Sequence, residues 1–236
     1  MIKKNSNFLA IIPARGGSKG IKRKNLYLLA GKPLLSWTIE ASLKSSYVSN
    51  TYVSSEDREI LELAKKSGVQ CIKRPSYLSD DYAETEPVLL HAIEKITSQI
   101  SYDFLILLQA TSPLRNSRHI DEACKKILKD GTDSLISVTE ADNKVLKQLL
   151  IADSHGYLST GFKKKFKSMP RQKLPDIYFQ NGAINISKLD AFSKNPTFIQ
   201  DKTSMYVMDK EKSIDIDTLD DIKLASEIMK KDSRCL

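Results

Sequence analysis

The chain has 236 residues, of which 41% are hydrophobic and 28% are charged, and its formal net charge at pH 7 is +8. This length and composition predict one soluble globular domain, while the wide spacing of the three cysteines argues against a disulfide framework and against structural zinc. The positive charge fits a nucleic-acid-binding protein or an enzyme for polyanionic substrates, because both must attract phosphate oxygens.

From the N-terminus onward, short apolar runs alternate with amphipathic segments. The first run follows a polar start and has only about six apolar residues, so we expect neither a signal peptide nor a membrane span. We therefore expect a cytoplasmic protein. Strands are predicted at residues 8–12, 52–54, 69–73, 104–108 and 134–138, and helices at 34–45, 56–67 with Ser55 as cap, 85–98 and 120–129. This alternation predicts a Rossmann-like three-layer α/β fold with a mostly parallel central sheet covered on both faces.

The pattern changes between residues 140 and 176. This stretch contains a strand-like segment at 147–151, a turn at His155-Gly156 and a polar, lysine-rich part. We interpret it as a small insertion within a single domain that spans residues 1–236. Strands are predicted again at 182–186 and 206–208, and a last helix at 219–230, where Thr218 and Asp221 have the spacing of a capping box.

The first candidate site is the segment from Arg15 to Asn25, called here the basic loop. It combines three glycines with five basic residues directly after the first predicted strand, and ligands of open α/β sheets bind beyond the carboxyl ends of the strands. Glycines let backbone N–H groups approach phosphate oxygens, and basic side chains neutralise their charge. The spacing matches neither the P-loop nor the dinucleotide-binding motif. The basic loop therefore predicts a triphosphate site of another kind, the alternative being a basic surface turn.

The second candidate site is the acidic segment, residues 213–217, in which Asp215 and Asp217 alternate with isoleucines. In a strand, this alternation would place both carboxylates on one face. Two adjacent carboxylates repel each other unless a cation lies between them, and oxygen ligands near phosphates suit Mg²⁺. We therefore predict Asp215 and Asp217 as Mg²⁺ ligands, with a solvated edge strand as the alternative.

Polar residues also follow the strand predicted at 104–108. Gln109, Thr111 and Ser112 can offer hydrogen bonds to a ligand at the end of that strand, although they could equally mark the exit from the strand before a helix capped by Ser117. Residues 179–183 pose the same choice, because Asn-Gly is also a turn signal. The histidines suggest no catalytic triad, and no G-x-S-x-G motif is present.

Four ordered motifs now make a family recognisable. They are I-I-P-A-R-G-G-S-K-G-I-K-R-K-N at 11–25, L-L-Q-A-T-S-P-L-R at 107–115, P-R-Q followed by N-G-A-I, and S-I-D-I-D-T at 213–218. With them, the chain resembles the CMP-sialic acid synthetases, also called acylneuraminate or nonulosonic acid cytidylyltransferases, over about residues 11–225. The resemblance implies a GT-A-like nucleotidyltransferase fold, Mg²⁺ as cofactor, and a homodimer in which the insertion at 140–176 reaches the partner's site. It also implies attack by the anomeric hydroxyl of the sugar acid on the α-phosphate of CTP, with release of pyrophosphate.

The resemblance further implies roles for single residues. CTP would be held by Arg15, Ser18, Lys19, Lys24, Asn25 and Arg74, the sugar acid by Gln109, Lys147 and Arg171, and Mg²⁺ by Asp215 and Asp217; of these, Arg15, Lys24, Asp215 and Asp217 would assist catalysis directly. Phe179 departs from the family pattern, because sialic acid synthetases often have an arginine two residues before N-G-A-I.

Several substrates stay open at this stage. N-acetylneuraminate is the first choice, legionaminic and pseudaminic acids are the alternatives, and the eight-carbon acid Kdo follows. A non-catalytic nucleic-acid-binding module would also explain the charge, but few aromatic residues lie among the basic stretches, which counts against stacking on bases. We therefore expect no nucleic-acid partner.

Overall fold

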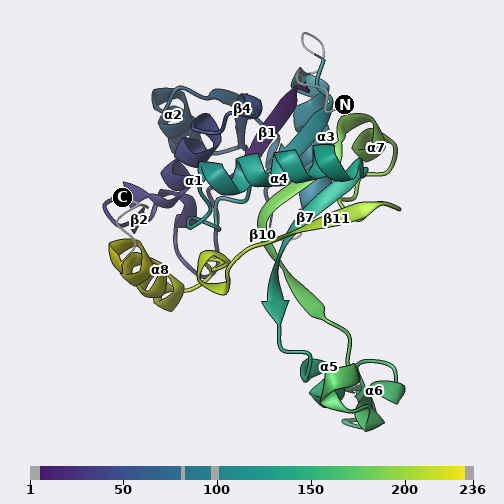
Figure 1. The fold of residues 1–236 in the computed structure, drawn as a ribbon. Helices are drawn as coiled ribbons and strands as arrows, with labels where there is room; N and C mark the ends of the chain where they lie inside the picture. Colours follow the sequence, from purple (N-terminus) through teal and green to yellow (C-terminus); the bar gives the residue numbers. More distant parts are fainter. Residues whose placement is uncertain (1–5, 81–82, 97–100, 232–236) are drawn as a thin grey trace.

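The computed structural model describes residues 6–80, 83–96 and 101–231 (Figure 1). A seven-stranded sheet crosses the molecule in the order β11-β7-β10-β6-β1-β4-β5. Its strands are β1 (Phe8–Pro13), β4 (Val48–Ser55), β5 (Gln70–Lys73), β6 (Phe104–Leu107), β7 (Ser134–Ala141), β10 (Ile177–Lys188) and β11 (Thr203–Val207). Only β10 runs antiparallel to its neighbours, β6 and β7. The prediction of a mostly parallel α/β sheet is confirmed.

Helices cover both faces of this sheet (Figure 1). Alternate residues of β1 point to opposite faces, so Phe8, Ala10 and Ile12 pack in one core cluster while Leu9 and Ile11 pack in another. The first cluster includes residues of α1 (Leu34–Leu43), α2 (Arg58–Lys66) and α4 (Ser117–Asp130), and the second includes residues of α3 (Thr85–Ile96) and α7 (Leu189–Lys194). Burial on both faces explains why β1 is apolar throughout.

The helix caps differ from the sequence prediction in two places. The N-cap of α2 is Asp57 rather than Ser55, and its carboxylate accepts a hydrogen bond from the backbone N–H of Ile60 at 3.0 Å. The N-cap of α4 is Asn116 rather than Ser117, so this helix begins earlier than predicted. The end of the predicted helix at 85–98 lies outside the described residues.

The last helix, α8 (Leu219–Lys231), begins with the predicted capping box. The backbone N–H of Thr218 donates to the Asp221 carboxylate at 2.7 Å, and the N–H of Asp221 donates to the Thr218 hydroxyl at 3.3 Å. This start fixes the direction of the chain directly after the acidic segment.

The residues between β7 and β10 form an arm that stands out from the main body (Figure 1). It contains α5 (Val145–Gln148), β8 (Leu150–Ala152), β9 (Leu158–Thr160), α6 (Lys165–Ser168) and the short 3₁₀ turn η3 (Arg171–Lys173). The strand predicted at 147–151 is wrong in its first half. The Asp142 carboxylate accepts from the N–H of Lys144 at 2.9 Å, and this local turn starts a helical segment instead.

The remaining regular elements are short. They are η1 (Lys24–Leu26), β2 (Leu28–Leu29), β3 (Lys32–Pro33), η2 (Ser76–Leu78) and η4 (Lys210–Lys212). Within the described ranges, no helix has the length and apolar character that crossing a membrane requires.

Candidate active site

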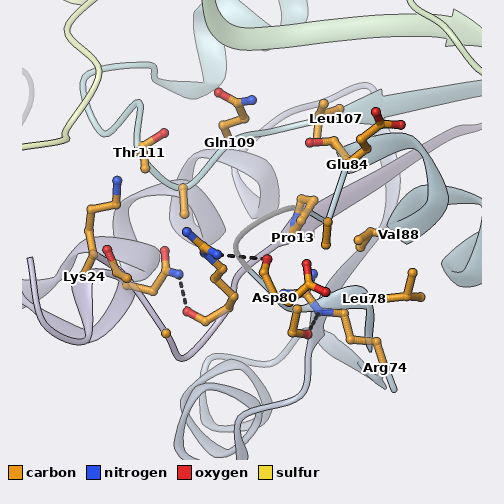
Figure 2. A pocket seen from close by; sticks show the side chains of 18 of the residues that line it. Pro13, Lys24, Arg74, Leu78, Asp80, Glu84, Val88, Leu107, Gln109 and Thr111 are labelled. Carbon is orange, nitrogen blue, oxygen red and sulfur yellow. Dashed lines mark hydrogen bonds between the residues drawn. The ribbon is translucent and has the colours of Figure 1, made fainter. Parts of the chain in front are cut away.

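A cleft of about 370 Å³ lies where β1 and β6 end. Its walls come from parts of the chain that are far apart in sequence, and Figure 2 shows Lys24, Arg74 and Gln109 placed around the same hollow. The predicted site residues that line it are Arg15, Ser18, Lys24, Asn25, Arg74, Gln109, Asp215 and Asp217. The fold therefore brings together most of the residues chosen from sequence.

The basic loop packs directly against the acidic segment. The Lys24 ammonium donates to the carbonyl oxygen of Ile216 at 2.8 Å and forms an ion pair with the Asp217 carboxylate at 2.9 Å. A Cβ atom on Gly20 would collide with the backbone carbonyl of Asp217. Glycine at position 20 thus allows the close approach that sets the two segments side by side.

Two acidic residues after β4 hold the basic loop at two further points. Glu56 accepts a hydrogen bond from the backbone N–H of Gly16 at 2.7 Å and another from the Arg74 guanidinium at 3.1 Å. Asp57 accepts from Arg23 at 3.0 Å, and its carboxylate occupies the space that a Cβ on Gly16 would need. Neither residue was among the predicted site residues, although both directly follow a predicted strand, where ligands of α/β sheets bind.

Electrostatics keeps Glu56 ionised. Burial alone would raise the pKa of this carboxyl, but hydrogen bonds from Gly16 and Ser79 and the charge of Arg74 outweigh burial and hold the pKa below its ordinary value. Burial lowers the pKa of Arg74, which is only 5% exposed, and Glu56 opposes that effect. This ion pair fixes the buried guanidinium of Arg74 at the cleft wall.

Arg15 lies beside this pair. Its guanidinium donates to the carbonyl oxygen of Asp80 at 3.0 Å (Figure 2), and its own carbonyl accepts from the Asn25 side-chain amide at 2.8 Å. The second bond closes the basic loop on itself. Lys19 belongs to the same loop but is exposed and is not among the described residues that line the cleft.

The acidic segment does not form the predicted strand. Residues 213–217, all described, have no regular structure, and the N–H of Ile216 donates to the carbonyl of Thr111 at 2.8 Å. The alternation of side chains nevertheless holds, because Ile214 and Ile216 pack in a cluster with α8 while Asp215 and Asp217 are exposed in the cleft. Packing of the isoleucines, rather than a strand ladder, points both carboxylates the same way.

The two carboxylates differ in environment. Surrounding protein atoms raise the pKa of Asp215, and the negative charges of Asp217 and Asp221 raise it further, while a hydrogen bond from Thr111 and the charge of Lys24 oppose the shift. Among the described residues, no group of three or more histidine, cysteine, aspartate and glutamate side chains could hold a metal ion. A pair of carboxylates still fits Mg²⁺, since Mg²⁺ often takes one or two carboxylates together with substrate phosphates and water.

A second hollow of about 410 Å³ shares Gln109 and Asp215 with the cleft; we call it the side pocket. Its other lining residues are Thr139, Phe179, Gln180, Asn181, Gly182 and Ser213. Gly182 has φ +68, and a Cβ there would meet the Gln109 side chain, so glycine gives Gln109 its position. Phe179 is 56% exposed at the rim.

Two predicted sugar contacts lie on the arm instead. The Lys147 ammonium donates to the carbonyl of Met169 at 2.9 Å, and the Arg171 guanidinium is 3.8 Å from the Asp142 carboxylate. The described residues that line the cleft and the side pocket include neither of them. The structure therefore does not bring them to the site of their own chain.

Known proteins match nearly the whole chain. A family model described as cytidylyltransferase matches residues 9–230. The pseudaminic acid cytidylyltransferase of Campylobacter jejuni serotype O:2 is 34% identical over 224 residues, which are 94% of this chain and 96% of that one. The N-acylneuraminate cytidylyltransferase of Escherichia coli O18:K1:H7 is 35% identical over 230 residues, which cover 97% of this chain but only 54% of that longer protein.

Solved structures agree on the fold. The structure of CMP-2-keto-3-deoxy-manno-octonic acid synthetase complexed with CTP superposes with a TM-score of 0.72, covering 96% of this chain and 99% of that one at 14% identity. The 4-diphosphocytidyl-2C-methyl-D-erythritol synthase of Anaerococcus prevotii gives a TM-score of 0.67 at 11% identity, covering 95% and 96% of the two chains. At these identities the likeness shows the fold alone.

Proposed function

Because this chain belongs to the cytidylyltransferase family, we propose that it transfers CMP from CTP to the anomeric hydroxyl of a nonulosonic acid, with N-acetylneuraminate as the first candidate. The observation that carries this proposal is the contact between the basic loop and the acidic segment, made through Lys24 and Gly20 on one side and Asp217 on the other. The contact sets a basic segment, suited to a triphosphate, beside an acidic segment, suited to a metal ion, and Asp215 of the acidic segment also lines the side pocket.

In the proposed reaction, the anomeric hydroxyl gives its proton to solvent water and its oxygen forms a bond to the α-phosphorus of CTP, while the bond from that phosphorus to the bridging oxygen of pyrophosphate breaks. Arg15 and Lys24 stabilise the negative charge on the departing pyrophosphate, and Gln109 orients the sugar acid from the shared wall. Asp215 and Asp217 would hold Mg²⁺, which supplies charge neutralisation and Lewis-acid polarisation when bound. Positioning and charge thus provide most of the catalysis, and no side chain is assigned as general base.

Replacement of one carboxylate tests the metal assignment. Asp217→Asn should reduce pyrophosphate release by about 100-fold or more, with the unfolding temperature unchanged, because the Asp217 side chain is 71% exposed and contributes little to packing. Asp220→Asn is the matched control, since this carboxylate is 89% exposed on α8 and pairs with Lys223 instead. An undiminished rate in Asp217→Asn, measured at saturating CTP and Mg²⁺, would sink the metal assignment.

Pseudaminic acid is the second candidate substrate. The Campylobacter relative matches this chain over nearly its full length, and the exposed ring of Phe179 gives the rim of the side pocket an apolar surface. Mixing CTP and Mg²⁺ with N-acetylneuraminate, legionaminic, pseudaminic and Kdo acids, and identifying the CMP-sugar by mass spectrometry, decides between them. Salt-sensitive binding to oligonucleotides without any CTP turnover would favour the nucleic-acid-binding alternative. The cytoplasmic location remains a prediction.

We also propose that the chain acts as a homodimer through its arm. The hairpin of β8 and β9 exposes Ile151 at 54%, Tyr157 at 75% and Leu158 at 65%, and apolar groups gathered in this way mark interaction sites. Leu158→Asp should lower the mass measured by light scattering to that of a monomer. The matched control is Ile199→Asp on the main body, where the side chain is 69% exposed. A dimer that persists in Leu158→Asp would contradict this interface.

A mixing experiment tests whether the arm serves the partner's cleft. If Lys147 acts in the neighbouring site, Lys147→Ala and Asp217→Asn each inactivate a homodimer, but a mixed dimer keeps one site with neither change. After subunit exchange, half of the dimers are mixed, so activity should recover to roughly a quarter of the wild-type value. No recovery in a mixture shown to contain mixed dimers would place Lys147 in its own chain's site, and a Lys147→Ala homodimer that keeps full activity before mixing would place Lys147 outside catalysis.

A further inference from the structure

Arg115 lies at the end of the loop that follows β6 and is 1% exposed. Among the fully buried side chains of the described residues, that of Arg115 is the largest. Its Nε atom donates to the carbonyl oxygen of Ala183 at 3.0 Å. Its Nη2 atom donates to the hydroxyl of Thr38 at 2.7 Å and to the carbonyl oxygen of Gln109 at 3.2 Å. One guanidinium thus joins α1, the end of β6 and the middle of β10.

The charge of Arg115 has no counter-ion within the described chain. None of the described carboxylates forms an ion pair with it, and Nη1 has no hydrogen-bond partner there. Burial lowers the pKa of Arg115 to about 9, so the guanidinium stays protonated at neutral pH. An unpaired buried cation is costly, because low-dielectric surroundings disfavour its charge. A binding site that brings an anion close to it would explain why the protein keeps it.

The groups that Arg115 holds belong to the walls of the side pocket. Gln109 lines the side pocket, and Ala183 follows Gly182, which lines it as well. The pairing of β10 with β7 shifts register between Gln180 and Asn185, so the chain between these two residues needs other partners. The carbonyl oxygen of Ala183 accepts a hydrogen bond from Arg115, and the N–H of Ala183 donates to the side-chain oxygen of Asn181 at 3.2 Å.

We infer that Arg115 is a positioning residue for the sugar acid, acting in two ways. It holds the backbone of Gln109 and Ala183 at the side pocket, and its uncompensated positive charge favours an anion bound there without touching it. The inference rests on the proposed function, because it takes the ligand of the side pocket to be a sugar that carries a carboxylate. The basic loop is held separately, by Glu56, Asp57 and Asp217, so nucleotide binding should depend little on Arg115.

The test compares the two substrates in one enzyme. Arg115→Met should raise KM for the sugar acid by about tenfold or more, because a charged hydrogen-bond donor is lost, while KM for CTP changes by less than about threefold. Arg115→Lys should recover part of the affinity for the sugar acid, since it restores the charge but not the fork of donors. The control is Arg118→Met on α4, whose side chain is 81% exposed and pairs with Glu122; it should leave both KM values unchanged.

A purely structural role would give a different result, with a lower unfolding temperature and both KM values changed together or neither changed. Either of these outcomes overturns the inference. If the Arg115 variants do not fold, Thr38→Val replaces them, because it removes an acceptor of the guanidinium and keeps the charge. It should raise KM for the sugar acid by about threefold with KM for CTP unchanged, and equal KM values for variant and wild type would overturn the inference. A wild-type protein that forms no CMP-sugar from any acid of the panel refutes the proposed function first, and the inference falls with it.

Discussion

Replacing Gly20 by alanine should separate the two halves of the site. The added Cβ would collide with the backbone carbonyl of Asp217, and the two groups would have to move apart by roughly 1 Å to reach van der Waals distance. Residue 20 is exposed, so the basic loop can move outward without disturbing the core. We therefore expect a small loss of stability, about 1 kcal/mol, but a fall in kcat of about 100-fold, because the cations would no longer face the phosphates correctly.

Two measurements check this prediction. Thermal unfolding without ligands gives the stability change, for which about 1 kcal/mol corresponds to a shift of roughly 2–4 °C in a chain of this size. Pyrophosphate release at saturating substrates gives kcat. Gly17→Ala is the matched control for unfolding, since a Cβ on Gly17 meets nothing within 4 Å, and its unfolding temperature should equal that of the wild type. If Gly20→Ala keeps at least half of the wild-type kcat, close contact between the basic loop and the acidic segment is not needed for the reaction.

Three further predictions concern the residues around the cleft. Glu56→Gln should lower the free energy of unfolding by about 1–3 kcal/mol at neutral pH, because the Arg74 guanidinium loses its charged acceptor. The pKa of Glu56 is depressed in the folded protein, so this difference, measured by urea unfolding, should shrink as the pH falls through that pKa. The pKa of Asp215 is shifted in the opposite direction, upward, so its ionisation lowers the free energy of unfolding as the pH rises through that pKa. At neutral pH and without metal ions, Asp215→Asn should therefore unfold at a higher temperature than wild type, while its turnover falls. Gly182→Ala should lower the free energy of unfolding by about 1–2 kcal/mol because of the positive φ at this position, and it should raise KM for the sugar acid by displacing Gln109. An unchanged KM would show that the position of Gln109 does not matter for the sugar.

Local sequence signals predicted the elements but not all of their ends. The apolar run of β1 and the capping box of Thr218 and Asp221 could be recognised from sequence, because each is a pattern of a few residues that lie close together in the chain. The cap of α2 does not. Ser55 and Asp57 are both good caps, and the choice depends on β5, since the carbonyl of Ser55 accepts from the N–H of Arg74 at 3.0 Å and so keeps Ser55 in the sheet.

The same distinction applies to the site. The basic loop and the acidic segment could be found from sequence because each concentrates one kind of charge in a few residues. Glu56 and Arg115 could not be recognised in this way, because their roles depend on which segments meet across the sheet. Glu56 acts on a loop forty residues earlier in the chain, and Arg115 acts on a carbonyl 68 residues later. Lys147 lies on the arm, and its proposed role needs a second chain.

The cations of the cleft fall into a fixed group and an exchangeable group. Arg74 is buried and bound to Glu56, and breaking such a pair would leave an uncompensated buried charge, so its guanidinium should keep its place when CTP binds. The pair of Lys24 with Asp217 is different, because the carboxylate is 71% exposed and exposed pairs contribute only about 0–1 kcal/mol. Lys24 can therefore leave Asp217 at little cost, and on the proposed function it would bind a phosphate oxygen while Asp217 would become free to hold the metal ion. In the proposed reaction, the ion pair would thus hold both groups close to the positions from which they act until the substrates replace it.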